Sequence, residues 1–488
     1  MQVLTLSVLS LLLATSSGDV ELCMKCMCNK KALIQPLYTV RCSHLNLHDT
    51  FPDLQQWPKY AQLKGTRMAV NFDWNNVRHL QRFPNIPGIV SLSLQHNNMV
   101  KIAGSAFVEL DNLKALDLSY NQLTAEGVQA DVFQGRYSPQ HYNPLGIVVL
   151  NLGNNQIHTL SPHSFEHLPN LTELRLNNNP LKTLSPATLM SLASPESLQV
   201  LDLAYTGLSG LPEEFVQLSS IRHKLQLLYL NGNQFSHVPQ TLAALGDSLQ
   251  KLSLNENPIQ ELDEDSFRGL LMLRELNMSA MSYLRRIGPA TFRHLRSLEI
   301  LFCSYNRNLT ELDAEAFGYG DNRWTLRELH LQSNALHTLP TQLAPWKKLA
   351  IVDVQDNPWR CDCNLDWFIN ELLPLLEDTT PDLVLGLHCS EPLHLSGMSF
   401  LGLRNSINSS FLCDGIVRSP SENIQRHSAG LYPVFQAVSI ILLISIAGLA
   451  VLYYLQLTKN VTHGTQTQVI SDIPYMRVRT EVCREFAS

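Results

Sequence analysis

Apolar and polar positions alternate in one frame that recurs through most of this chain. The frame reads apolar-x-x-apolar-x-apolar-x-x-Asn-x-apolar, and one copy runs from Leu113 to Leu123 with Asn121 at the polar position. Its central Leu-x-Leu pair has the two-residue period of a strand that buries one face and exposes the other. Because so short a strand cannot cover its own buried face, each copy needs a neighbouring copy on either side.

The copies follow one another at a nearly constant interval. A weaker first copy lies around Val70, and the second apolar residue of the later copies falls at 92, 116, 150, 174, 201, 228, 252, 276, 301, 329 and 352. Most steps are 24 to 28 residues, which is the period of leucine-rich repeats. We therefore predict an α/β fold, a leucine-rich-repeat solenoid of about twelve repeats that curves into a horseshoe with its strands on the concave side.

Other positions of the frame predict how the repeats hold together. Asparagine occupies the polar position in ten of twelve copies, and Thr206 and Met281 replace it in the others. A buried amide there can bond to the backbone of neighbouring repeats, so its recurrence predicts a ladder. Cys303 stands at an inward leucine position, which favours a reduced core thiol. On the convex side we expect a stacked spine of phenylalanines at Phe107, Phe133, Phe165, Phe215, Phe267, Phe292 and Phe317.

Apolar segments near both ends predict how the chain meets a membrane. Val3 to Ala14 is apolar and small residues follow it, which is typical of a cleaved signal peptide at 1–18. Residues 434–457 carry no charge, and as a helix they would reach roughly 36 Å, enough to cross a bilayer. A buried helix of a soluble domain is the alternative. We expect a single-pass type I protein of the plasma membrane with its ectodomain outside and residues 458–488 inside.

The cysteines indicate an oxidising compartment. Two groups of four cysteines flank the repeats. The first is Cys23, Cys26, Cys28 and Cys42, and the second is Cys361, Cys363, Cys389 and Cys413. In a secreted segment each group predicts two disulfides, and a zinc site is the competing interpretation for the first group. The formal net charge of −7 is ordinary for this length and argues against nucleic acid as a partner.

These features together resemble those of a known protein family. The repeat frame, the cysteine group before it and the segment from Asn357 to Trp367 are similar to extracellular leucine-rich-repeat proteins with cysteine-rich caps, over residues 23–413. The resemblance implies an N-terminal cap at 19–62, repeats at 63–356 and a C-terminal cap at 357–413. The residues between Cys413 and the apolar segment would then form a stalk at 414–433. It also implies four disulfides, Cys23–Cys28, Cys26–Cys42, Cys361–Cys389 and Cys363–Cys413. The architecture, one repeat ectodomain followed by one membrane span and a short tail, resembles that of adhesion and recognition receptors of the Capricious and Tartan type.

The concave face is the default binding surface of such a solenoid. We expect aromatic and histidine side chains on it to contact a protein ligand, and an ordinary variable surface is the alternative. The candidate ligand-binding residues are Tyr205, Tyr229, Phe302, Tyr305 and His330. Between Gln134 and Pro144 one repeat swells by a polar segment, which we interpret as a tolerated surface loop rather than a binding loop.

Sequons predict glycans on the ectodomain, at Asn170, Asn277, Asn308 and Asn408. Asn277 falls among the concave positions, so a glycan there would partly block that face. In the tail, Tyr475 and Val478 bound a Tyr-x-x-apolar motif that resembles the sorting signal read by endocytic adaptors. Phosphorylation of Tyr475 is the alternative.

Nothing in the sequence favours catalysis, and we expect no enzyme, no cofactor and no bound metal. His158, His163 and His167 lie close in sequence but fall on the convex return of one repeat, without a completing ligand. The predicted function is recognition or adhesion at the cell surface, by binding a protein ligand or partner receptor through the ectodomain. An accessory co-receptor or decoy that modulates another signalling receptor is the alternative.

Overall fold

The computed structural model describes residues 21–406 apart from 32–36, 64 and 319–324. These residues belong to one compact unit, Met1–Gly415. The expected signal peptide (1–18), stalk (414–433), membrane span (434–457) and tail, with Asn408, Cys413, Tyr475 and Val478, lie outside the described residues. Among the residues that are described, no helix is both long and apolar enough to cross a membrane.

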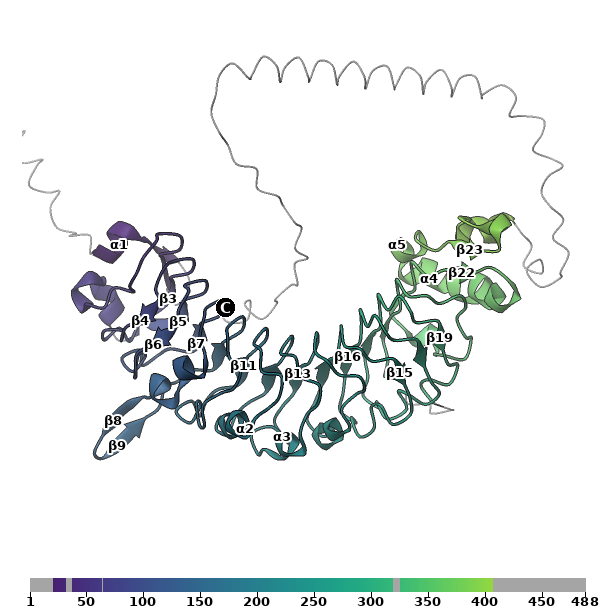
Figure 1. The fold of residues 1–488 in the computed structure, drawn as a ribbon. Coiled ribbons are helices and arrows are strands. Elements are labelled where there is room, and N and C mark those ends of the chain that lie inside the picture. Colours follow the sequence, from purple (N-terminus) through teal and green to yellow (C-terminus); the bar gives the residue numbers. More distant parts are fainter. Residues whose placement is uncertain (1–20, 32–36, 64, 319–324, 407–488) are drawn as a thin grey trace, which may run out of the picture. The chain divides into compact units, whose positions relative to one another are not determined.

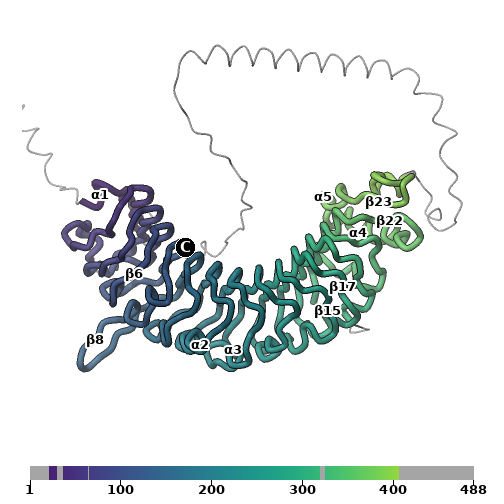
Figure 2. The backbone as a smooth tube through the Cα atoms, viewed as in Figure 1, coloured from purple at the N-terminus to yellow at the C-terminus, as the bar shows by residue number. Residues whose placement is uncertain are grey.

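One sheet of fourteen strands runs from the N-terminal cap to the last of the described repeats. β1 (Met27–Lys31) pairs antiparallel with β2 (Leu37–Arg41), and every later neighbour in the sheet is parallel. The strands that follow are β3 (Arg67–Asn71), β5 (Ile89–Ser93), β7 (Ala115–Asp117), β10 (Val149–Asn151), β11 (Glu173–Arg175), β12 (Val200–Asp202), β13 (Leu227–Tyr229), β14 (Lys251–Ser253), β16 (Glu275–Asn277), β18 (Ile300–Phe302), β20 (Glu328–His330) and β21 (Ile351–Asp353). Figure 1 shows them side by side along the inner side of an arc, and Figure 2 shows the backbone of the same repeats. The predicted solenoid is confirmed.

The inward leucines lie in one register from strand to strand. Leu116 pairs with Leu150, and Leu150 pairs with Leu174. All three side chains are buried. Full burial of a leucine contributes about 1.5–3 kcal/mol, so this continuous stripe accounts for much of the stability that joins one repeat to the next.

The buried asparagines form the expected ladder. Asn121 accepts hydrogen bonds from the backbone N–H groups of Asn97 and Met99 in the preceding repeat, at 3.0 and 2.9 Å. Its amide donates to the carbonyls of Leu94 and Leu118, both at 3.0 Å. At the first of the two exceptions, the Thr206 hydroxyl donates to the Leu203 carbonyl at 2.7 Å.

The return segments on the outer side are short and mostly irregular. They hold two α-helices, α2 (Pro186–Ala193) and α3 (Glu213–Gln217), which Figure 1 shows on the outside of the arc. Ser185 begins α2 by accepting a hydrogen bond from the Thr188 backbone. The remaining outer elements are 3-10 turns and two-residue strands: η3 (Ala125–Val128), η4 (Ala130–Phe133), η5 (Gln240–Leu245), η6 (Trp346–Lys348), β4 (His79–Leu80), β6 (Lys101–Ile102), β15 (Glu261–Leu262), β17 (Arg286–Ile287) and β19 (Glu311–Leu312).

The expected phenylalanine spine is interrupted. Phe83, Phe107, Phe133 and Phe165 form one series of rings, with neighbouring centroids 6.2–6.3 Å apart. A second series joins Phe267, Phe292 and Phe317 at 5.9 and 4.9 Å. Phe215 is buried on α3 between the two series. The reason for the gap is the sequence, because leucines, Leu189 on α2 and Leu242 on η5, occupy the corresponding position on either side of Phe215.

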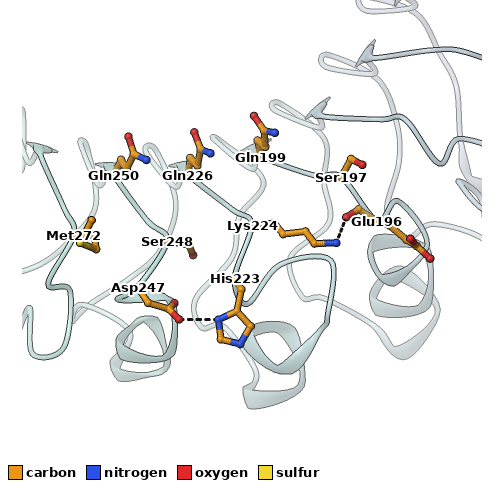
Figure 3. Close-up of a pocket in the computed structure, with 10 residues that line it drawn as sticks. All are labelled: Glu196, Ser197, Gln199, His223, Lys224, Gln226, Asp247, Ser248, Gln250 and Met272. Carbon is orange, nitrogen blue, oxygen red and sulfur yellow. Dashed lines mark hydrogen bonds and ion pairs between the residues drawn. The ribbon is translucent and has the colours of Figure 1, made fainter.

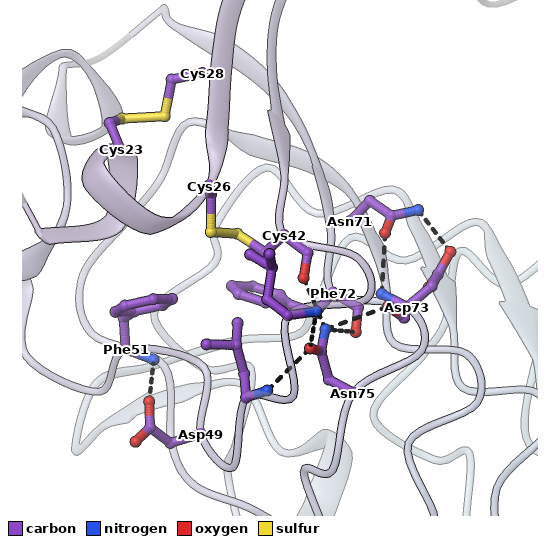
Figure 4. The surroundings of a disulfide bond; sticks show 12 residues. Cys23, Cys26, Cys28, Cys42, Asp49, Phe51, Asn71, Phe72, Asp73 and Asn75 are labelled. Carbon is purple, nitrogen blue, oxygen red and sulfur yellow. Dashed lines mark hydrogen bonds between the residues drawn. A yellow bond between two sulfur atoms is a disulfide. The ribbon is translucent and has the colours of Figure 1, made fainter. Parts of the chain in front are cut away.

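The N-terminal cap is closed by two disulfides beside α1 (Glu21–Lys25), η1 (Leu54–Gln56) and η2 (Lys59–Gln62). Cys23 is bonded to Cys28 and Cys26 to Cys42, as the resemblance implied (Figure 4). Asn75 of the first repeat donates to the Cys42 carbonyl at 2.7 Å. The asparagine ladder therefore begins on the disulfide-bonded cap itself.

The C-terminal cap covers the last repeat with a small helical module. Its elements are β22 (Trp359–Arg360), η7 (Cys363–Leu365), η8 (Phe368–Leu372), α4 (Leu373–Thr379), α5 (Pro381–Val384), β23 (Cys389–Glu391), η9 (Leu393–Leu395) and α6 (Phe400–Ser406). Phe368 contacts the rings of Trp359 and Phe400 at 5.7 and 5.2 Å. Cys361 is bonded to Cys389. The other implied pair includes Cys413, which lies outside the described residues.

The polar insertion is a β-hairpin and not the loop that the sequence suggested. β8 (Arg136–Ser138) pairs antiparallel with β9 (His141–Asn143), and the hairpin projects from the repeats in Figure 1. Arg136 forms ion pairs with Glu109 and Asp111 at 2.6 and 3.5 Å. The Tyr142 hydroxyl bonds to His167 Nδ1 at 2.7 Å. Contacts to the repeats on both sides fix this insertion, which explains why it is ordered.

Candidate recognition surface

Two parallel rows of side chains line the inner side of the solenoid. The first, the strand row, is the solvent-facing residue between the two inward leucines of each repeat. Successive members are in register from strand to strand. From β7 to β21 the row reads Asp117, Asn151, Arg175, Asp202, Tyr229, Ser253, Asn277, Phe302, His330 and Asp353.

Three of the predicted ligand-binding residues belong to the strand row. Phe302 and His330 stack on neighbouring strands, with ring centroids 4.6 Å apart and planes 22° apart. Tyr229 is half-buried on β13, and Ser253 and Asn277 separate it from Phe302. The structure therefore does not join Tyr229 to the Phe302–His330 pair as one aromatic strip.

Charged groups surround Tyr229. Lys251 Nζ lies 2.9 Å from Glu275 Oε2, and Arg175 lies 2.5 Å from Glu173 Oε1. Burial raises the pKa of the Tyr229 hydroxyl above its ordinary value. Burial also raises the pKa of Asp202 to about 6, although a hydrogen bond from the Ala204 backbone opposes the shift.

The second row, the edge row, is the residue just before the ladder position in each repeat. Every member has a left-handed backbone, with φ between 52° and 66°. Its members are His44, Trp74, His96, Tyr120, Asn154, Asn178, Tyr205, Gly232, Glu256, Ala280, Tyr305, Ser333 and Asp356. This conformation costs a non-glycine residue roughly 1–2 kcal/mol. Hydrogen bonds between repeats hold it, as where the Tyr120 N–H donates to the Gly153 carbonyl at 3.0 Å.

The remaining two predicted residues, Tyr205 and Tyr305, belong to this edge row. Among the described residues, six tryptophan and tyrosine side chains are exposed, and four of them are edge-row members. Their exposed fractions are 52% for Trp74, 47% for Tyr120, 41% for Tyr205 and 54% for Tyr305. Large aromatic side chains in water therefore concentrate at one position of the repeat.

At the N-terminal end of the edge row four rings stack on one another. The centroids of His44 and Trp74 are 5.5 Å apart, those of Trp74 and His96 3.7 Å, and those of His96 and Tyr120 4.2 Å. The interplanar angles are 10–18°. We call these four residues the ring stack. Sequence reasoning missed the stack, although a signal was present, because Trp74, His96 and Tyr120 each precede a ladder asparagine.

Two carboxylates, those of Asp73 and Asp117, lie beside the ring stack. Asp73 accepts hydrogen bonds from the Ser93 hydroxyl at 2.6 Å and the Gln95 backbone at 2.9 Å. Asp117 accepts from the Ser119 hydroxyl at 2.6 Å and the Asn151 amide at 3.0 Å. Burial raises the pKa of Asp117. Burial also lowers the pKa of His96, although both carboxylates oppose that shift.

Farther along the edge row, Tyr205 spans a glycine. Its hydroxyl donates to Glu256 Oε1 at 2.6 Å, two repeats away. A Cβ on Gly232 would overlap the Tyr205 ring, so the absence of a side chain there makes room for the tyrosine. Burial and the Glu256 carboxylate raise the pKa of Tyr205 to about 12.

A shallow polar hollow lies on another edge of the sheet, where the strands begin. Its volume is about 410 Å³. The side chains of Gln199, Gln226 and Gln250 lie in a row above it, and His223 Nδ1 meets Asp247 Oδ2 at 2.7 Å (Figure 3). The hollow is open, and Met272 is its one apolar lining residue among those described, so it does not have the character of a small-molecule site.

The sequons occupy different surroundings. Asn170 and Asn308 are exposed on return segments, and Asn308 donates to the Ser282 carbonyl at 2.6 Å. Asn277 is half-buried on β16, in the middle of the inner sheet. A glycan on Asn277 would stand in the strand row, at a distance from the ring stack.

The sequence matches the Leucine rich repeat family at residues 87–135, 146–196 and 223–280. Among curated relatives, chicken Tsukushi is 30% identical over 53% of this chain and 58% of its own length. Mouse Podocan-like protein 1 is 31% identical over 50% of this chain and 48% of its own length. Quail Lumican is 30% identical over 45% of this chain and 56% of its own length. The chain thus spans only about half to three-fifths of the length of these relatives.

Solved structures match this chain at lower sequence identity, with TM-scores below 0.5. In the mouse RP105/MD-1 complex, the similar chain is 18% identical with a TM-score of 0.48, over 73% of this chain and 52% of that one. The Leptospira interrogans leucine-rich-repeat protein LIC12759 is 23% identical with a TM-score of 0.44, over 65% and 78%. The matched segments and the described architecture are those of a leucine-rich-repeat solenoid.

Proposed function

We propose that this chain is a recognition protein that binds a protein partner through the edge row of its solenoid. The observation that carries the proposal is the concentration of exposed aromatic residues at one repeat position, with Trp74, Tyr120, Tyr205 and Tyr305 all in that row. Tryptophan and tyrosine dominate the energetics of protein interfaces. Side chains fixed on a regular backbone also lose little entropy on binding.

The proposed setting is the cell surface. The disulfides of both caps support an oxidising compartment. The apolar segments at 3–14 and 434–457 support a signal peptide and a single membrane span. We propose a type I arrangement like that of the short-tailed Capricious and Tartan receptors, with a tail that an endocytic adaptor reads at Tyr475. We propose binding rather than catalysis, without a cofactor or metal.

Proximity labelling on living cells tests this function. The labelling enzyme is fused to the membrane-anchored chain, outside the cell at the stalk. Wild type is compared with a variant in which Trp74, Tyr120, Tyr205 and Tyr305 become asparagine, a residue that tolerates the left-handed backbone and already stands in the row at Asn154 and Asn178. The matched control replaces the exposed Tyr137 and Tyr283, which lie outside the row.

We expect a defined set of surface proteins to be labelled by the wild type and the control, and to be lost with the edge-row variant. Aggregation of non-adherent cells that express the chain would assign the function to adhesion. Labelling of a signalling receptor without aggregation would assign it to the accessory or decoy role. Equal labelling by the wild type and the edge-row variant would contradict binding through this row.

A further inference from the structure

The ring stack differs from the rest of the edge row because its rings cover one another. Trp74 lies between His44 and His96, so both of its faces have an imidazole partner. His96 lies between Trp74 and Tyr120. The next member of the row is Asn154, and so the series of rings ends at Tyr120. Tyr120 is 47% exposed, and among the described residues no ring covers its second face.

The charges beside the ring stack are unbalanced. Among the ion pairs of the described residues, none includes Asp73 or Asp117. Both carboxylates are held by neutral donors, and both act electrostatically on His96. Arg41 faces the same side on β2, in register with Asn71. Arg67 faces the same side but stands at the start of β3. At the ends of the strands, where Asp73 and Asp117 lie, one arginine therefore faces two carboxylates, and negative charge is in excess.

We infer that the ring stack receives a basic side chain, arginine or lysine, from an exposed segment of the partner protein. This inference rests on the proposed function and names the partner chemistry at one part of the same surface. A guanidinium can lie flat on the open face of Tyr120, where the ring attracts a cation. The potential of Asp73 and Asp117 favours the same charge. An acidic segment would meet those carboxylates at a surface of low dielectric and would be repelled.

The spacing of the stacked rings also fixes the geometry of such a contact, with His44 on the cap and the other three rings on successive repeats. Neighbouring strands are about 4.8 Å apart, so the edges of the stacked rings form a continuous aromatic surface along the solenoid. His96 separates Tyr120 from Trp74, so a guanidinium on the outer face of Tyr120 leaves the ring edges of His96 and Trp74 for apolar neighbours in the same segment. The contact therefore favours a basic residue next to apolar ones over an isolated charge.

A displayed library of random linear peptides is the probe for this inference. The library is selected on the disulfide-bonded ectodomain, residues 19–433, and in parallel on a variant with Trp74→Asn, His96→Asn and Tyr120→Asn. Tyr305→Asn is the matched control, because it alters the same repeat position outside the stack. Thermal denaturation and the disulfide content of each protein establish that the variants are folded.

We expect peptides with arginine or lysine beside apolar residues to be enriched on the wild type and on Tyr305→Asn. The stack variant should bind them roughly three- to thirty-fold more weakly, the range that corresponds to a cation on an aromatic face. Asp117→Asn should weaken the same peptides less, and added salt should weaken them on the wild type.

The absence of stack-dependent basic peptides, or the enrichment of acidic ones, would overturn the inference. Either result would leave the proposed function standing if proximity labelling still depends on the edge row. If proximity labelling did not depend on the edge row, the proposed function would be wrong, whatever peptides the library yields. The two tests therefore fail separately.

Discussion

Removal of the ladder asparagine Asn121 should destabilise the solenoid at one identifiable place. Its amide makes five hydrogen bonds of 2.9–3.1 Å, to two N–H groups and three carbonyls. In Asn121→Ala the Leu94 carbonyl keeps the amide of Asn97, at 3.1 Å, and the Leu118 carbonyl keeps the amide of Asn155, also at 3.1 Å. The backbone N–H groups of Asn97 and Met99 lose the side-chain acceptor that they share.

The expected cost follows from those two N–H groups. A buried donor without a partner costs about 1–3 kcal/mol, so two of them predict a loss of about 2–6 kcal/mol. Asn121 is 7% exposed, and water can reach the site only in part, which places the expectation near the middle of this range. Gln122→Ala alters an exposed residue of the same repeat and should change stability by less than about 0.5 kcal/mol.

Two measurements on the secreted ectodomain check the prediction. Urea denaturation followed by circular dichroism gives the change in free energy of unfolding. Hydrogen exchange reads the two amides directly, and Asn97 and Met99 should lose protection while amides several repeats away keep it. A cost below about 1 kcal/mol, with both amides still protected, would refute the claim that the ladder joins the repeats.

Three further predictions follow from particular contacts. Gly232→Ala should displace the Tyr205 ring and its bond to Glu256, at a cost of about 1–3 kcal/mol; if the cost is unchanged in a Tyr205→Ala background, the ring is not responsible. Asp202 has a folded pKa raised to about 6 from 3.8, so its ionisation opposes folding above pH 6, and the penalty disappears as the pH falls toward 4. Asp202→Asn should therefore stabilise the ectodomain at pH 7, by at most about 3 kcal/mol, and not at pH 4; equal effects on unfolding at both pH values would contradict this. Cys303 is buried with a pKa raised to about 12, so iodoacetamide at pH 8 should modify it only after denaturation. Mass spectrometry of the Cys303 peptide checks this, and alkylation of the native protein would contradict it.

The repeat frame predicts the fold well because a single requirement fixes it. Leu116 and Leu118 must both face inward, and the asparagine that follows must reach the preceding repeat, so spacing alone sets the strand, its register and the ladder. The three described disulfides follow from the resemblance instead, because spacing alone allows several pairings.

The recognition surface was predicted only in part, since solvent-facing positions carry little constraint. Tyr205 and Tyr305 were selected as aromatic, but the sequence pattern does not show that they share a left-handed backbone with Trp74 and His96. That conformation directs all four side chains toward solvent along one row. The hairpin at Arg136–Asn143 escaped prediction because its strands have three residues each, too few for a visible alternation. Its order depends on contacts that are distant in sequence, such as Tyr142 with His167.

A glycan placed on the edge row shows whether the partner protein binds there. Tyr120→Asn together with Gln122→Thr creates a sequon on the row, and Tyr137→Asn together with Pro139→Thr creates one on the hairpin. The measurement is binding of fluorescent ectodomain tetramers to a panel of cell lines by flow cytometry, with occupancy of both sites established by mass spectrometry. We expect the edge-row glycan to abolish binding and the hairpin glycan to leave it unchanged. Unchanged binding with the edge-row glycan, or loss of binding with the hairpin glycan alone, would contradict it.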